Sequence, residues 1–187
     1  MLNIHNIATS NYVNGNGCRY VLWLQGCDLA CTGCWNTETW SFEKRILKTV
    51  DEVFKEIINL RDTINGITFT GGEPFLQSDE LSKLAQLVKE NTNLDIQIFS
   101  GFDIEELQSD FKKVLLNYTD ILVSGRYDKN KINNNQSLYL LNKDIDPWQF
   151  NNSDVQIDID INANIKITGY PTNKLIKMIE KENNARV

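Results

Sequence analysis

Apolar and polar positions along the chain fall into short runs that predict strands alternating with helices. Residues 20–24 form an apolar run rich in β-branched and aromatic side chains, which is typical of a buried strand. Three more strands are predicted, at residues 67–70, at residues 120–123 and, from an alternating pattern, at residues 94–99. Residues 1–17 are mixed in character and end in a turn rich in asparagine and glycine.

Helices are predicted between these strands. The clearest covers residues 49–61, where Thr49 and Glu52 form a capping-box pattern and apolar residues recur every three to four positions. A second amphipathic helix is predicted over about 78–90. A third begins at about Asp103, again with a glutamate three residues later.

Strands that alternate with helices at this spacing predict an α/β fold with a mostly parallel sheet. Right-handed crossovers would curl such a sheet into an open or partial barrel. Residues 155–161 alternate strictly and residues 165–168 return after a turn, which predicts a β-hairpin with one apolar face, followed by a short amphipathic helix. The hairpin either finishes the sheet or offers a surface to a partner.

Length and composition indicate an ordinary globular protein. A chain of 187 residues is most simply one domain over residues 1–187, with residues 155–187 as an extension. The net charge of −6 and isoelectric point of about 4.9 argue against nucleic-acid binding. The chain has no apolar run of membrane-spanning length and no signal-like amino terminus, so we expect a cytoplasmic protein without membrane partners.

Three of the four cysteines lie together, directly after the predicted strand at residues 20–24. Cys27, Cys31 and Cys34 have the spacing C-x3-C-x2-C, whereas a buried structural cysteine has no reason to recur at loop spacing. Three thiolates on one tight loop are suited to bind three irons of a [4Fe–4S] cluster. The fourth iron would then stay open to a substrate.

Two other interpretations of the cysteines remain at this point. A structural zinc site needs four ligands, and Cys18 is available as the fourth. A disulfide framework is the other, although a chain of this size holds a core without such links. The position of Cys18 after an Asn-Gly turn is more typical of a half-buried strand residue than of a ligand.

The cysteine loop, the Trp35 that follows it and the later sequence Thr-Gly-Gly-Glu-Pro at residues 70–74 together resemble the radical S-adenosylmethionine (SAM) superfamily. The flanks of the loop, residues 13–19 and 35–40, resemble the anaerobic ribonucleoside-triphosphate reductase activating proteins. The resemblance covers most of the chain, from about residue 11 to residue 136.

The resemblance implies a [4Fe–4S] cluster on the three loop cysteines, with the amino and carboxylate groups of SAM on the open iron. The Gly-Gly-Glu segment would contact the amino end of SAM, although a Gly pair before Pro is often merely a turn. Ser100 is a weaker candidate for the ribose. The residues expected to bind SAM are Gly33, Trp35, Thr70, Gly71, Gly72 and Glu73.

The resemblance also implies the reaction. One electron, from a reduced flavodoxin or ferredoxin type donor, reduces the cluster, and SAM is cleaved to methionine and a 5′-deoxyadenosyl radical. In activating enzymes that radical removes a hydrogen from a glycine of a partner glycyl-radical enzyme, here most simply the anaerobic ribonucleotide reductase. No acid–base side chain is required, and His5 is expected to be an ordinary strand or surface residue.

Two further functions stay open. The first is a small radical SAM enzyme that acts on another peptide or protein. The hairpin favours it, as does Asn135-Gln136 standing in an Asn-rich loop, residues 129–136, without the Arg-Gly-Ser that usually precedes this pair in activating proteins. That loop is otherwise a plain solvated connection. The second is a non-catalytic metal-binding interaction module, with Cys18 completing a zinc site.

Overall fold

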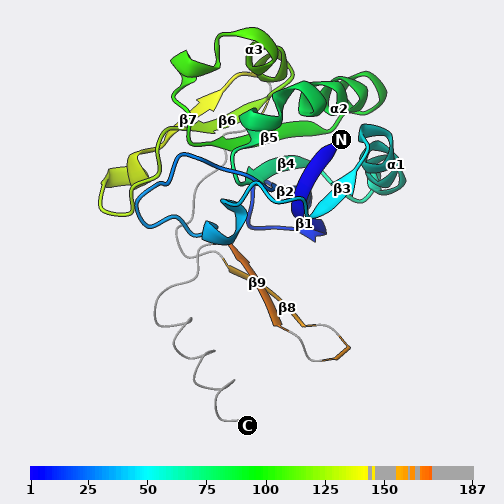
Figure 1. Cartoon of the computed structure of the whole chain (residues 1–187). Helices are drawn as coiled ribbons and strands as arrows, with labels where there is room; N and C mark the ends of the chain where they lie inside the picture. The colour runs from blue at the N-terminus through cyan, green and yellow to red at the C-terminus, as the bar shows by residue number, and fades with distance from the viewer. Residues whose placement is uncertain (143–144, 146–154, 160, 163–164, 170–187) are drawn as a thin grey trace.

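The structure is a computed structural model that describes residues 1–142, 145, 155–159, 161–162 and 165–169. In this part of the chain, seven strands form one sheet in the order β3-β1-β2-β4-β5-β6-β7, and β8 and β9 form a separate hairpin (Figure 1). The strands are β1 (Leu2–Asn11), β2 (Arg19–Leu24), β3 (Ile46–Lys48), β4 (Gly66–Gly71), β5 (Asp95–Ser100), β6 (Ile121–Ser124), β7 (Ser137–Leu140), β8 (Val155–Ile159) and β9 (Ile165–Gly169).

The four central strands, β2, β4, β5 and β6, are parallel, as the alternating pattern predicts. The sequence-based prediction of a mixed α/β fold with a mostly parallel central sheet and a C-terminal hairpin is confirmed. The predicted helix at residues 170–187 lies outside the described residues. Within the described residues β8 and β9 pair only with each other, so the hairpin does not finish the large sheet.

Helices cover one face of the sheet, and the hairpin lies on the other side (Figure 1). The α-helices are α1 (Val50–Leu60), α2 (Ser78–Asn91) and α3 (Asp110–Asn117). The capping box expected at Thr49 and Glu52 is present at the start of α1. Apolar side chains from the strands form the buried core with the helices, among them Leu22, Phe69 and Ile98. None of the helices in the described part of the chain is long and apolar enough to span a bilayer.

The third helix differs from its prediction. Asp103 and Glu106 do form a capping box, but it closes a short 3₁₀ helix, Ile104–Leu107. The chain then turns through an extended Ser109, and α3 begins at Asp110, which has a positive φ of 49°. A capping box marks a helix start without fixing the length of the helix, so the pattern alone does not reveal this break.

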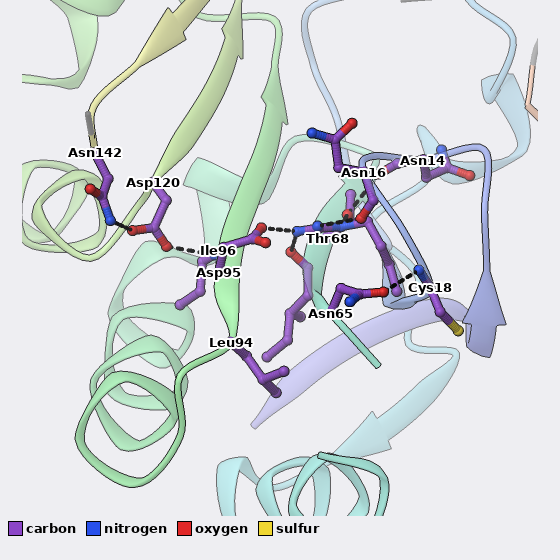
Figure 2. Close-up of polar contacts among 12 residues, drawn as sticks. Asn14, Asn16, Cys18, Asn65, Thr68, Leu94, Asp95, Ile96, Asp120 and Asn142 are labelled. Atoms are coloured by element: carbon purple, nitrogen blue, oxygen red, sulfur yellow. Dashed lines mark hydrogen bonds and ion pairs between the residues drawn. The ribbon is translucent and has the colours of Figure 1, made fainter. Parts of the chain in front are cut away.

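Buried polar groups join the strands at the amino ends of the parallel sheet (Figure 2). The guanidinium of Arg19 is fully buried, and it donates to Thr68 Oγ1 at 2.7 Å and to Asp95 Oδ1 at 2.5 Å. On the other side of β5, the Asp120 carboxylate accepts from Ile96 N at 2.7 Å and from Asn142 Nδ2 at 3.0 Å. These contacts fix the strand register at the end of the sheet opposite the cysteine loop.

Candidate metal and cofactor site

The cysteine loop starts at the carboxyl end of β2 and is held by backbone hydrogen bonds. Gly26 N donates to Thr39 O at 2.7 Å, and Cys27 N donates to Trp40 O at 3.1 Å. These bonds join the two ends of the segment 26–40. Gly26 has a φ of 104°, which favours glycine. The carboxyl ends of parallel strands are where α/β proteins usually bind ligands.

The three thiols of the loop are free, half-buried and exposed to one cavity of about 310 Å³. Burial raises the pKa of the Cys27 thiol to about 11, and the Glu73 carboxylate adds to the effect. Burial also raises the pKa of Cys31. The thiols of Cys27 and Cys31 therefore keep their protons until a cation enters, which suits a site for a positively charged metal group. Within the described ranges, no three His, Cys, Asp or Glu side chains converge closely enough to hold a single metal ion.

Cys18 lies at the opposite end of β2 from the loop. Its Sγ is 3.3 Å from Ser10 Oγ, and its backbone N donates to Asn65 Oδ1 (Figure 2). The six residues of β2 separate it from the other cysteines by roughly 20 Å, at about 3.3 Å per residue. The structure therefore does not bring Cys18 to the other three thiols, which argues against the four-cysteine zinc site.

The Gly-Gly-Glu segment ends β4, directly beside the cysteine loop. Gly72 N donates to Leu24 O at 2.8 Å, and Glu73 N donates to Gly26 O at 2.9 Å. A Cβ on Gly72 would stand 2.3 Å from Gly26 O, and Gly71 has a φ of 97°. Only glycine fits this close approach of two backbones, so the pair is more than a turn before proline.

Glu73 is a buried carboxylate in the wall of the cavity. It accepts hydrogen bonds from Ser100 Oγ at 2.9 Å, Gly101 N at 2.7 Å and Phe75 N at 3.0 Å. Burial raises its pKa to about 7, against the opposing effect of these three donors. Ser100, the weaker ribose candidate, thus donates to Glu73 and supports the carboxylate.

Trp35 and Gly33 differ in their positions. Trp35 is partly exposed, lines the cavity and donates from Nε1 to Tyr127 Oη at 3.1 Å. Gly33 is the one predicted residue absent from the cavity wall: a Cβ there would stand 2.3 Å from Lys129 Cδ. Thr70 lines the cavity from β4. All other predicted cluster and SAM residues share this wall.

Several residues of the wall were not predicted from the sequence. His5 lines the cavity from β1, with Nδ1 2.9 Å from Gln25 Oε1, although it is expected to be an ordinary residue. Trp23 and Phe99 line it from the central strands. In β2, Trp23 stands between two residues of the helix-covered core, so the period-two alternation of a strand would have assigned it to the other face.

The segment after β6 folds against the cysteine loop. Arg126 donates to the carboxylate of Glu106 at 2.7 and 3.0 Å and also to the carbonyl of Gly101. Further along, Lys129 N donates to Thr32 O at 3.4 Å.

A family model described as a 4Fe–4S single cluster domain matches residues 13–143. The anaerobic ribonucleoside-triphosphate reductase-activating protein of Enterobacteria phage T4 is 34% identical over 133 residues, which are 69% of this chain and 83% of that protein. The pyruvate formate-lyase-activating enzyme of Staphylococcus aureus is 34% identical over 148 residues, 75% of this chain and 57% of that enzyme. Among solved structures, QueE from Escherichia coli aligns with a TM-score of 0.44 and 18% identity, over 54% of this chain and 52% of that one.

The fold, the three free thiols and the matched family model together define an iron–sulfur protein of the radical SAM class. The chain belongs to the family of the anaerobic ribonucleoside-triphosphate reductase-activating proteins. The family predicted from the sequence is thus confirmed, and with it the cofactors of that family, a [4Fe–4S] cluster and SAM.

Proposed function

We propose that this protein is an activating enzyme that installs a glycyl radical on an anaerobic ribonucleotide reductase. One observation carries the proposal: the three free thiols of the cysteine loop and the Gly71–Glu73 segment line the same cavity. That cavity lies at the carboxyl ends of the adjacent parallel strands β2 and β4. The identity to the phage T4 activating protein over most of both chains supports the choice of target.

In this proposal Cys27, Cys31 and Cys34 hold the cluster. They are the cysteines that line the cavity, and backbone hydrogen bonds hold the two ends of the loop together. When bound, the cluster and SAM supply one-electron reduction and a 5′-deoxyadenosyl radical that removes a glycine hydrogen. The protein positions both groups and excludes water.

Thr70, Gly71 and Gly72 would, in the same proposal, lie against SAM, and Glu73 would accept a hydrogen bond from its amino group. The Glu73 carboxylate is buried and accepts three hydrogen bonds from the protein, and a further N–H donor would stabilise its charged form. Trp35 would cover the adenine or methionine part. Gly33 acts from outside the wall, by letting Lys129 pack against the loop.

We extend the proposal to the whole chain. The central sheet is the partial (β/α) barrel of radical SAM enzymes, in a single domain over residues 1–187. The electron donor is a reduced flavodoxin or ferredoxin type protein in the cytoplasm. The acidic net charge of −6 supports the expectation that no nucleic acid is bound.

The test is anaerobic incubation of the reconstituted protein with the anaerobic ribonucleoside-triphosphate reductase of the same organism, dithionite and SAM. Electron paramagnetic resonance should show a glycyl radical on the reductase, and a Cys31→Ala variant should give none. Pyruvate formate-lyase is the second target, because a pyruvate formate-lyase-activating enzyme aligns over 75% of this chain. A radical on pyruvate formate-lyase alone would change the target, and a radical on neither would refute the proposed function.

A further inference from the structure

The β8–β9 hairpin is a two-stranded sheet that stands apart from the large sheet (Figure 1). It also lies beyond residues 13–143, the part of the chain that matches the family model. A two-stranded hairpin is marginally stable in water unless it packs on something. The contacts of its two faces therefore show which face packs on the protein and which face is left for a partner.

The strand register sorts the hairpin into an apolar and a polar face. Ile157 pairs with Ile167 and Ile159 pairs with Ile165. Directly paired residues point to the same face, and faces alternate along each strand. The four isoleucines thus share one face, which we call the isoleucine face: Ile157, Ile159, Ile165 and Ile167. Gln156 pairs with Thr168 on the other face.

The polar face is the one that rests on the protein. Gln156 Oε1 accepts from Tyr12 N at 2.9 Å, and Gln156 Nε2 donates to Ser10 O at 3.1 Å. Thr168 Oγ1 accepts from Asn11 Nδ2 at 2.9 Å. A hairpin usually buries its apolar side on its own protein, and this one does the reverse.

Three of the four side chains of the isoleucine face are consequently exposed. The exposed fractions are 48% for Ile157, 47% for Ile165 and 67% for Ile159, and Ile161 beside the turn is fully exposed. Single exposed apolar residues are common on protein surfaces, but a contiguous apolar patch marks an interaction site.

The isoleucine face continues into the candidate site. Ile167 lies in the wall of the cavity that also contains the three thiols and Glu73, and Thr168 and Gly169 beside it line the same cavity. From Ile167 the face runs outward through Ile157 and Ile165 to Ile159. A polypeptide segment that reaches the cavity along this wall contacts the isoleucine face on its way.

We propose that the isoleucine face is the docking surface for the glycine-bearing segment of the partner glycyl-radical enzyme. This inference rests on the proposed function. Four isoleucine side chains can bury far less surface than the roughly 1,600 Å² in total that a stable interface buries. This small area suits a transient enzyme–substrate contact rather than a permanent dimer. A second copy seated on this face would also cover the cavity wall in both copies.

The test compares a hairpin variant with a matched control. Ile157→Thr/Ile159→Thr removes apolar surface and keeps β-branched side chains, so the strand is preserved. The control is Ile46→Thr, because Ile46 is 42% exposed on an edge strand and pairs with Ile4, whose side chain belongs to the core under the helices. Each protein is reconstituted anaerobically and titrated with the purified anaerobic ribonucleoside-triphosphate reductase. Uncoupled 5′-deoxyadenosine formation with dithionite is measured without the reductase.

The hairpin double variant should bind the reductase at least tenfold more weakly and form 5′-deoxyadenosine at the rate of the unsubstituted protein. Ile46→Thr should change neither quantity. Equal reductase affinity in the double variant and the control would overturn the inference, as would an unsubstituted protein that cleaves SAM and does not bind the reductase. A dimer dissolved by the double substitution would assign the face to a second copy and refute it. A clearly lower melting temperature than that of Ile46→Thr would show that the chain itself covers the face. Failure of the unsubstituted protein to cleave SAM would instead refute the proposed function.

Discussion

At the scale of single residues, the proposed SAM site depends on how Glu73 is held. Its carboxylate is buried and takes hydrogen bonds from two backbone N–H groups and the Ser100 hydroxyl. A buried carboxylate is unfavourable unless hydrogen bonds or an opposite charge stabilise it, so a ligand that donates to Glu73 favours its charged form. In the proposed function that donor is the amino group of SAM.

Glu73→Gln keeps the size of this side chain and removes its charge. We expect the dissociation constant of SAM to rise tenfold to a hundredfold, because a hydrogen bond to a charged group contributes about 1.5–3 kcal/mol. The iron content should not change. Equilibrium binding of SAM to the reconstituted protein measures the effect, with Glu38→Gln as the control, since Glu38 is an exposed carboxylate on the same cavity. Equal SAM affinity in the two variants would remove Glu73 from the site.

Individual residues also show which parts of the site the sequence alone predicts. His5 belongs to no recognisable motif, and only the pairing of β1 with β2 brings it to the cavity. Trp35 and the Gly71–Glu73 segment stand in motifs and were found. Motif spacing thus predicts residues that lie on one loop or at one strand end, whereas contacts made by pairing of distant strands have no local signal.

At the scale of secondary-structure elements, the parallel strands β2, β4 and β5 carry the site near their carboxyl ends and are joined by buried polar groups at their amino ends. All four parallel strands were predicted, β2 and β6 from an apolar run and β5 from its alternating pattern. The antiparallel strands β1, β3 and β7 were not predicted. Their burial patterns are mixed and partly exposed, so neither alternation nor a long apolar run marks them.

Substitution of Arg19 tests whether the buried polar groups stabilise the sheet. Arg19→Met removes a buried guanidinium, so Asp95 loses its ion-pair partner and Thr68 loses the hydrogen bond it accepts from Arg19. Breaking a buried ion pair costs roughly 3–5 kcal/mol, so the free energy of unfolding should fall by about 3 kcal/mol. Urea denaturation of the apoprotein measures it, against Arg45→Met, which removes an exposed arginine. A loss no larger than in the control would mean that the network does not stabilise the sheet.

At the scale of the whole molecule, the two faces of the sheet have separate tasks. The helices and the buried core lie on one face, and the hairpin lies on the other side (Figure 1). The cavity is lined by the side chains of Trp23, Thr70 and Phe99, which alternate along their strands with residues of that core. The fold therefore does not depend on what the cavity contains.

Removal of the cluster should accordingly leave the fold intact. We expect apoprotein and reconstituted protein to give the same far-ultraviolet circular dichroism spectrum and to unfold cooperatively. A structural zinc site behaves differently, because its binding free energy is folding free energy. An apoprotein without secondary structure would contradict the separation of core and site.

SAM cleavage after anaerobic reconstitution with iron and sulfide tests directly whether the loop cysteines hold the cluster. Dithionite is the reductant, and 5′-deoxyadenosine is the product measured. Cys31 lines the cavity, while Cys18 lies at the far end of β2. We predict that the unsubstituted protein and Cys18→Ala form 5′-deoxyadenosine at equal rates and that Cys31→Ala forms none. Loss of the product in Cys18→Ala, or its retention in Cys31→Ala, would contradict the assignment of the cluster to the loop.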